Sequence, residues 1–384
     1  MLALPRALAD GTPAISLCVL FACGALTCFS FFMIGYCAHV TGATSLPQLW
    51  DATIGHSSAV VVEVIIVVDT VLSCTAFALL IGDYATLCTK GLLPGLPDLL
   101  HSRSALILLV GLLVLLPLSL IRQLSLLRYS SLVGMACTMY VFLYVVSDSS
   151  RLALEGWTSE GTGLSVPPFE FRPGGLLRGV AIFSCAFMSH FQAPAFYADL
   201  KGRSPGRFAA LCVVSFGAAM LIYSAFGISG LYRFGAGVPG NALAGYPLTT
   251  PVILMFLGMS LCVTASFPLV FQGLLEAAVR LMSRATHTQL KSESTVGVLL
   301  TVAMVIAVCV FATFCQDLSA AVGLCGSISG ACLTLVFPGI IMLYLKQRKT
   351  RPFRVIAWTL VVLGVLTGIF SASVVISRDI LGNP

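Results

Sequence analysis

The chain has 384 residues, of which 58% are hydrophobic and 9% are charged, and its mean hydropathy is +1.01. A chain of this composition cannot keep a water-soluble surface, so a soluble globular protein is excluded and an integral membrane protein is predicted. The net charge of +6 is spread over short clusters between apolar blocks, a pattern of membrane topology. We therefore expect no nucleic-acid partner.

The residues that carry chemistry in enzymes do not gather into a catalytic or metal-binding pattern. Most of the fourteen cysteines lie inside apolar blocks, where a thiol behaves as a small buried hydrophobe. No CxxC pair is present, and the five histidines are scattered along the chain. We therefore expect no catalytic residues, no metal site, no cofactor and no enzyme activity.

The apolar residues come in blocks of about twenty, the length that a helix needs to cross a bilayer. This length predicts an all-helical, polytopic bundle and argues against a β-barrel. Ten full spans are expected, near 14–40, 58–82, 104–121, 130–147, 175–199, 207–232, 250–280, 295–314, 318–345 and 355–376. Of the 21 Lys and Arg residues, thirteen fall in one set of alternate loops, which the positive-inside rule places in the cytosol.

The stretch FSCAFMSHFQAPAFYADLKG (183–202) is the most irregular of the apolar blocks. Pro194 removes an intrahelical hydrogen bond and disfavours helical geometry in the residue before it, so this helix is expected to break near 188–194. Unwound backbone at membrane depth is tolerated where it is buried in protein or lines a cavity. The stretch is therefore a candidate binding site, and the alternative is an ordinary proline kink.

The first ten residues repeat part of this pattern. ALPRALAD (3–10) and QAPAFYAD (192–199) share Pro, Ala and Asp at equal spacing, and they head segments five helices apart. That placement predicts inverted-topology repeats whose first helices are both broken at the midplane, so residues 1–10 are either half of a broken helix or a short surface segment. The expected division of one transmembrane domain, 1–384, is repeat one at about 1–148, repeat two at about 175–345 and an extra last helix at about 355–376.

Six stretches together resemble the eukaryotic amino acid/auxin permease family, which has the LeuT-like inverted-repeat fold. They are LALPRALADG (2–11), SLLRYSSLVG (125–134), HFQAPAFYADLKG (190–202), GLYRFGAGVPGNAL (230–243), VTASFPLVFQG (263–273) and DLSAAVGLCGSISGACLTLVFPGIIMLYL (317–345). The resemblance implies eleven helices and secondary active transport of amino acids with H⁺ or Na⁺. The family has a G-x-G pair before the first of these motifs, where this sequence has Met1, so the first half-helix is expected to be missing from it.

The resemblance and the expected break together place a candidate site between the first, third, sixth and eighth helices of the family fold. The expected substrate-binding residues are Leu2, Ala3, Asp69, Ser184, Cys185, Ala186, Phe187 and His190, and the expected ion-coupling residues are Thr264 and Ser266. The two hydroxyls match the region that contributes to the sodium site of sodium-coupled relatives, or they bond back to the preceding turn. His190 either serves proton coupling or fixes the helix break.

Two acidic residues, Glu63 and Asp69, lie within the apolar stretch 60–75. An acid inside a span is costly and is therefore a functional candidate. Glu63 is near the expected start of its helix, so we expect it to reach the membrane interface. Asp69 is deeper, and it is either a proton-binding or substrate-binding group or a structural hydrogen-bonding partner within the bundle.

Two functions are compatible with this reading of the sequence. One is a secondary active amino acid transporter that works by alternating access, and the other is a non-transporting amino acid sensor or regulatory protein of the same fold. The expected partners are an amino acid, H⁺ or Na⁺, and membrane lipid. The expected location is the plasma membrane or the vacuolar or lysosomal membrane.

Overall fold

The computed structural model describes residues 1–93, 95, 97–121, 130–155, 172–289, 291–315, 317–345 and 350–380. Every regular element within these ranges is helical, and ten helical segments are long and apolar enough to cross a membrane. Each of them overlaps one of the ten expected spans, so the all-helical, multi-pass architecture is confirmed. The expected motif at 125–134 begins outside the described residues.

The first part of the described chain holds seven α-helices. They are α1 (Leu4–Asp10), α2 (Pro13–Thr41), α3 (Leu46–Thr53), α4 (Ala59–Leu92), α5 (Arg103–Val110), α6 (Leu116–Leu120) and α7 (Ser130–Leu154). A π-helical turn at Gly111–Leu115 joins α5 to α6, so that the two form one span.

The second part holds eight more. They are α8 (Pro173–Ala186), α9 (Ala193–Asp199), α10 (Pro205–Phe234), α11 (Thr250–Thr286), α12 (Thr295–Phe314), α13 (Leu318–Cys325), α14 (Phe337–Tyr344) and α15 (Arg351–Val375). Two π-helical turns, Gly326–Gly330 and Cys332–Val336, join α13 to α14 within one span. The division of the chain into two repeats stays a prediction.

The helix ends follow local sequence signals. Ser45, Ser204 and Ser294 cap α3, α10 and α12, because each side-chain oxygen accepts a hydrogen bond from a backbone N–H in the first turn. Gly42 and Gly235 follow the last residues of α2 and α10 with φ angles of 75° and 60°, which glycine adopts without strain. Short polar breaks therefore separate the long apolar helices.

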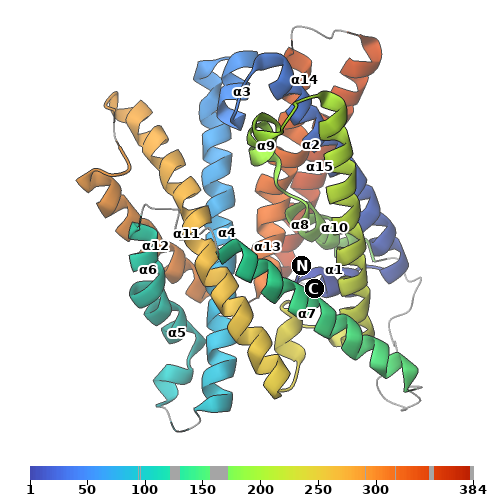
Figure 1. The fold of residues 1–384 in the computed structure, drawn as a ribbon, viewed down its shortest axis with the longest axis vertical. Coiled ribbons are helices and arrows are strands. Elements are labelled where there is room, and N and C mark those ends of the chain that lie inside the picture. The colour runs from blue at the N-terminus through green and yellow to red at the C-terminus, as the bar shows by residue number, and fades with distance from the viewer. Residues whose placement is uncertain are drawn as a thin grey trace.

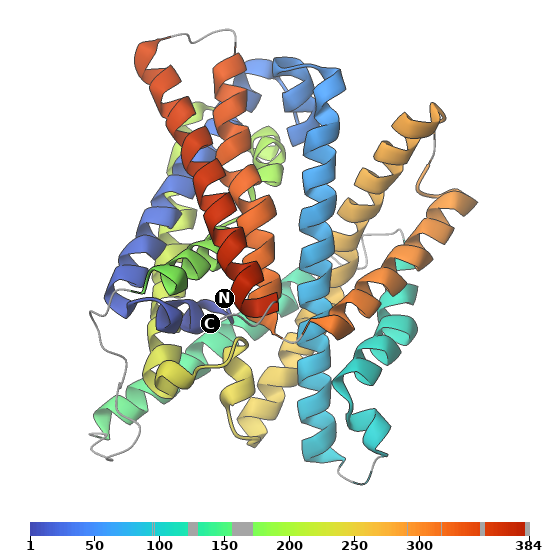
Figure 2. The same cartoon turned by 180° about the vertical axis from the view of Figure 1, so that it is seen from behind.

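The helices form two groups on either side of α4 (Figures 1 and 2). On one side lie α5, α6, α11 and α12, and on the other lie α2, α9 and α10. The short helix α1 packs against both α8 and α10, while α7 contacts α10 and α11 and so bridges the groups. Segments from both groups consequently meet at the centre of the molecule.

The span that contains α8 and α9 is broken. α8 ends at Ala186, α9 begins at Ala193, and one 3₁₀ turn at His190–Gln192 lies between them. The expected break near 188–194 is therefore confirmed, and it starts slightly earlier, at Phe187.

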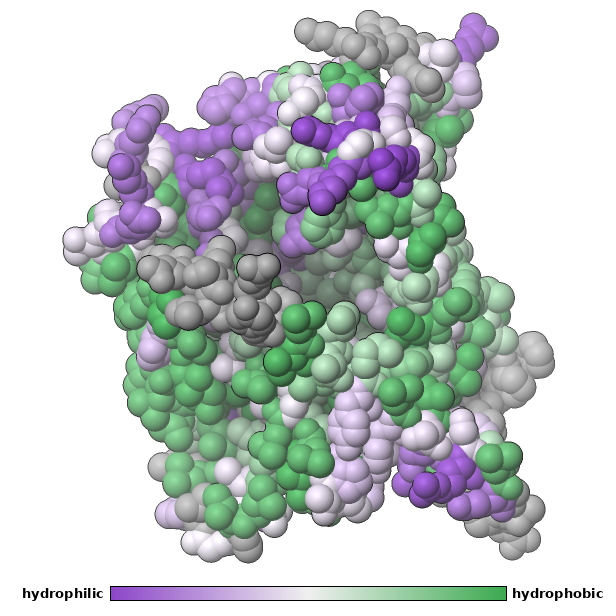
Figure 3. Space-filling model, in the orientation of Figure 1, coloured by the Kyte–Doolittle hydropathy of each residue, from purple (hydrophilic) through white to green (hydrophobic). Residues whose placement is uncertain are grey.

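The molecular surface matches a membrane-spanning protein. The face in Figure 3 is apolar over most of its height, with hydrophilic residues gathered at the top and at the lower right. A hollow lies below the upper hydrophilic band, at the end of the molecule where Figure 1 shows α3. The same end carries the end of α9, the start of α10, the end of α14 and the start of α15, which flank loops of the Lys- and Arg-rich set predicted to be cytosolic.

Candidate functional site

A cavity of about 1100 Å³ occupies the centre of the molecule. Its walls come from α4, α11, α13, the end of α8 and the first residues of the chain. Along α4 the lining runs from Glu63 to Leu80, which corresponds to about 25 Å of helix. At the α3 end the lining includes the exposed residues Gln48, Glu276 and Arg280, so the cavity reaches the surface there.

Six of the ten expected site residues line this cavity: Leu2, Ala3, Asp69, Cys185, Ala186 and Ser266. They come from four parts of the chain that are far apart in sequence, and the structure brings them to one space. The other four, Ser184, Phe187, His190 and Thr264, are not among the lining residues. The roles of all ten stay predictions.

Backbone at the end of α8 is held by a tyrosine from a neighbouring helix. The Tyr223 hydroxyl of α10 donates a hydrogen bond to the Ala186 carbonyl oxygen at 3.1 Å. Phe187 follows directly, and its buried ring lies 5.2 Å from that of Tyr223 and 6.3 Å from that of Phe216. Phe187 therefore packs against Phe216 and the lining residue Tyr223 without lining the cavity itself, while Cys185 and Ala186 line it.

His190 anchors the break to α2. Its fully buried imidazole has Nε2 at 2.9 Å from the Ser30 hydroxyl oxygen and at 3.2 Å from the Thr27 carbonyl oxygen. The Phe31 ring meets it edge-on at 5.5 Å. This arrangement agrees with the alternative in which His190 fixes the helix break.

Asp69 lies deep in the cavity and its residue is 3% exposed. One carboxylate oxygen, Oδ1, accepts hydrogen bonds from the Ser329 hydroxyl at 2.9 Å and from the Cys325 thiol at 3.3 Å. None of the ion pairs in the described part of the chain includes Asp69. Cys325 in turn contacts the Cys185 thiol at the end of α8.

The mouth of the cavity carries a second acidic residue. Glu63 is 1% exposed, and its Oε1 lies 3.5 Å from Arg280 Nε and 3.4 Å from Arg284 Nη2. The expectation that Glu63 extends to the interface is therefore wrong, because two arginines of α11 compensate its charge inside the protein. Its pairing was not visible in the sequence, since the partners are more than 200 residues away.

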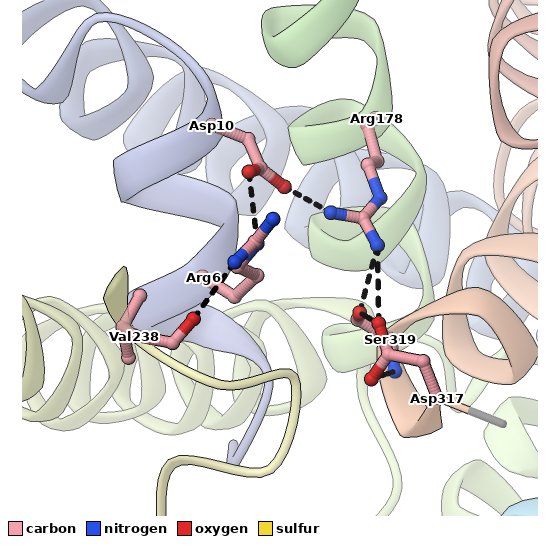
Figure 4. A network of polar contacts seen from close by, with 6 residues as sticks. All are labelled: Arg6, Asp10, Arg178, Val238, Asp317 and Ser319. Atoms are coloured by element: carbon pink, nitrogen blue, oxygen red, sulfur yellow. Dashed lines mark hydrogen bonds and ion pairs between the residues drawn. The ribbon is translucent and has the colours of Figure 1, made fainter. Parts of the chain in front are cut away.

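An arginine-centred network adjoins the cavity-lining residues Leu4 and Leu318 on α1 and α13 (Figure 4). Arg178 of α8, 4% exposed, forms an ion pair with Asp10 of α1. It also donates to the Ser319 hydroxyl at 2.8 Å and lies 3.4 Å from Asp317, the residue that caps α13. Arg6 adds an ion pair of 2.9 Å to Asp10. The network ties α1 and α8 to the start of α13.

A further ion pair lies near the Arg178 network. Arg103 of α5 has Nε at 2.6 Å from Asp83 Oδ1 of α4, and it donates to the Cys315 carbonyl oxygen at 2.8 Å. The Asn241 side chain donates to the other oxygen of Asp83 at 3.4 Å. Charged groups therefore connect several helices in this part of the molecule, and this network was not predicted from the sequence.

The two expected ion-coupling hydroxyls differ in position. Ser266 lines the cavity, and its hydroxyl donates to the Cys262 carbonyl oxygen at 2.8 Å, which is the back-bonding alternative. A hydroxyl that donates its hydrogen keeps lone pairs with which it can contact a cation. Thr264 lies outside the lining. Among the described residues, no group of three or more His, Cys, Asp and Glu side chains is arranged to hold a metal ion.

Comparison with known proteins adds independent observations. The sodium-coupled neutral amino acid transporter 7 of Xenopus laevis is 24% identical over 346 residues, which cover 85% of this chain and 73% of that protein. Solute carrier family 38 member 8 of Mus musculus is 24% identical over 360 residues, covering 88% of this chain and 80% of that protein.

Among solved structures, a manganese transporter of Eremococcus coleocola superposes with a TM-score of 0.59 at 16% identity, covering 100% of this chain and 84% of that one. At this identity the match concerns the fold alone, and it agrees with the LeuT-like fold that the sequence predicts. The family model described as transmembrane amino acid transporter protein matches residues 1–377. This chain therefore belongs to the transmembrane amino acid transporter protein family.

Proposed function

We propose that the protein is a secondary active transporter that carries amino acids across a membrane by alternating access, with Na⁺ as a coupling ion. The observation that carries the proposal is the cavity that opens beside α3, and the Arg178 network joins α1, α8 and α13 behind its lining residues Leu4 and Leu318. Alternating access requires a chamber that faces one side of the membrane at a time.

The walls of the chamber suit a zwitterion with a side chain of modest size. Broken-helix backbone at Cys185 and Ala186 supplies polar groups at mid-membrane depth, where a substrate carboxylate or ammonium group needs partners. Met259 and Val263 of α11 and Phe77 of α4 supply apolar surface for the substrate side chain.

Na⁺ is proposed because one of the two relatives described above, that of Xenopus laevis, is named as sodium-coupled. Ser266 is the proposed contact on α11, since it is the expected hydroxyl that lines the cavity. We further propose that the protein resides in the plasma membrane or in the vacuolar or lysosomal membrane. Imaging of the protein fused to a fluorescent protein tests this location.

Uptake into proteoliposomes tests the function directly. A panel of radiolabelled amino acids is offered with an inward Na⁺ gradient, and counterflow of the same substrates is measured without any ion gradient. We expect saturable uptake of at least one amino acid that falls when choline replaces Na⁺. Saturable binding without uptake or counterflow would overturn the transporter and support the amino acid sensor.

The proposed sodium contact has a matched control on the same helix. Ser266→Ala is expected to raise the Na⁺ concentration for half-maximal uptake several-fold, because one cation ligand is lost. Thr286→Ala removes a hydroxyl with the same back-bond, to the Met282 carbonyl oxygen at 2.8 Å, but outside the cavity. This control should keep the wild-type Na⁺ dependence, and an unchanged Ser266→Ala protein would remove Ser266 from the sodium site.

A further inference from the structure

Asp69 is an acidic side chain inside the apolar, membrane-spanning helix α4. It is ten residues from the start of this helix, or about 15 Å along it. Its residue is 3% exposed and it lines the cavity. A carboxylate inside a membrane span is costly unless a cation or hydrogen-bond donors compensate its charge.

The neighbours of Asp69 favour a proton over a larger cation. Two donors, the Ser329 hydroxyl and the Cys325 thiol, already point at Oδ1. Sodium requires several oxygen ligands, whereas part of the space around the Asp69 carboxylate is filled by the sulfur atoms of Cys325 and Cys185. A proton needs only one carboxylate oxygen.

The other titratable groups around Asp69 are thiols. Cys325 on α13 and Cys74 on α4 are near Asp69 itself. Cys185 on α8 lies beside Cys325, and Cys309 on α12 lies beside Cys74. The one amino group nearby, that of residue 1, lies beside Cys185. The charges at the cavity mouth, Glu63 with Arg280 and Arg284, begin about 9 Å further along α4. Among the described groups of this cluster Asp69 is the only carboxylate, and intramembrane carboxylates serve as proton relays in pumps and transporters.

Ser329 links Asp69 to the backbone of the neighbouring span. Its hydroxyl lies 2.9 Å from Asp69 Oδ1 and 2.7 Å from the Cys325 carbonyl oxygen, so one hydrogen has two possible acceptors. An ionised carboxylate is the stronger acceptor of the two, and a protonated one is the weaker. Protonation of Asp69 thus shifts the Ser329 hydrogen bond toward the carbonyl oxygen.

That carbonyl belongs to the span that packs on the helix break. Ser329 lies in the π-helical turn Gly326–Gly330, and π-helical turns are frequent at functional sites. The Gly326 end of this turn lies directly against the backbone of Ala181 and Cys185 in α8. A change at Asp69 consequently reaches the end of α8 through two adjoining contacts.

We propose that Asp69 is the proton-binding residue of this transporter, and that a proton taken from cavity water onto its carboxylate is carried with the amino acid. The step breaks one O–H bond of a hydronium ion in the cavity, makes one O–H bond to Asp69 and leaves a water molecule, and release on the other side reverses it. This inference rests on the proposed transport function and adds a proton to the transported species.

Substrate-driven proton flux tests the assignment. Full-length protein is placed in liposomes that contain a pH-sensitive dye, with equal Na⁺ on both sides, and an amino acid transported by the wild type is added outside. We expect the wild type to acidify the lumen on substrate addition. Asp69→Asn should lose this proton flux at least tenfold while its counterflow stays within about twofold. Asp51→Asn, a carboxylate at the cavity mouth, is the matched control and should retain the flux.

Three results would overturn the assignment. They are a wild type with counterflow but no substrate-driven proton flux, an Asp69→Asn protein that keeps the flux, and a folded Asp69→Asn protein without counterflow, which would instead place the substrate on Asp69. A wild type without counterflow refutes the transport function itself.

If Asp69→Asn does not fold, as judged by gel filtration, the Ser329→Ala protein tests the assignment in its place. Loss of a donor to the carboxylate should move half-maximal proton flux to higher pH, and an unchanged profile refutes the proposal.

Discussion

The contact between α8 and the π-helical turn that follows α13 depends on the absence of a side chain at Gly326. A Cβ atom at this position would lie 1.7 Å from the Ala181 carbonyl oxygen and 3.0 Å from the Cys185 backbone nitrogen. Ordinary contacts of a Cβ begin at 3.4 Å, so Gly326→Ala requires the two segments to separate by about 1.7 Å. Because both colliding groups are backbone, no rotamer change relieves the overlap.

The expected cost follows from two opposing terms. Overpacking of this kind destabilises by about 1–3 kcal/mol, and a backbone collision belongs at the upper end. Alanine returns up to about 1 kcal/mol through its higher helix propensity. We therefore expect Gly326→Ala to lower the free energy of unfolding by about 2 kcal/mol, and to slow counterflow because the break beside Cys185 is displaced.

Thermal unfolding of purified protein in detergent measures the first effect, and counterflow in proteoliposomes measures the second. Gly217→Ala on α10 is the matched control, because a Cβ there meets no atom within 4 Å and adds only helix propensity. Its Tm should equal or slightly exceed that of the wild type. If Gly326→Ala has the same Tm and counterflow rate as Gly217→Ala, then the turn after α13 does not pack on α8 as described.

Two further substitutions probe the Arg178 network and the helix break. Arg178→Gln leaves Asp10 with Arg6 as its only described ion-pair partner, so the cost is below the value of about 3–5 kcal/mol for an unpaired buried charge. A membrane-impermeant thiol reagent added from the side away from α3 should then label cavity cysteines faster than in the wild type. Tyr223→Phe leaves the Ala186 carbonyl oxygen unpaired, at about 1–3 kcal/mol, and should slow counterflow. Tyr140→Phe removes a similar but exposed hydrogen bond to a backbone carbonyl and should behave as wild type in the same assay.

Local signals predicted the architecture of the chain well. Blocks of apolar residues located all ten spans, because span length is set by the thickness of the bilayer and is written in consecutive residues. The break between α8 and α9 was equally local, since Pro194 and the small and polar residues before it act on their own backbone. Asp69 was found because an acid inside an apolar block stands out at once.

Orientation around the break could not be predicted. Cys185 and Ala186 line the cavity, but Phe187 packs against Phe216 and Tyr223 without lining it. Helical periodicity relates side-chain directions only while the helix continues, and it carries no information past residue 186. Placement of Phe187 depends on the position of Tyr223 in α10, which tertiary packing decides.

Partners of charged residues were also out of reach. Arg178 meets Asp10 and Asp317, which are 168 and 139 residues away, and each of them had many possible partners of opposite charge. Burial of an arginine in a membrane protein indicates that a partner exists, because an unpaired charge is costly there. It does not identify that partner, so the Arg178 network emerged only from the three-dimensional structure.

The ion pairs of Arg178 and of Glu63 connect different sets of helices. Arg178 ties α8 and α1 to the start of α13, so opening the cavity between these helices requires these pairs to separate. At the mouth, the ion pairs of Glu63 connect α4 only to α11. These two helices are neighbours that pack against each other. The mouth pairs can therefore persist in both states of the cycle, whereas the Arg178 pairs exist in one. The free energy of the Arg178 network consequently enters the balance between the two states directly, and a substrate shifts that balance only by the difference in its affinity for them.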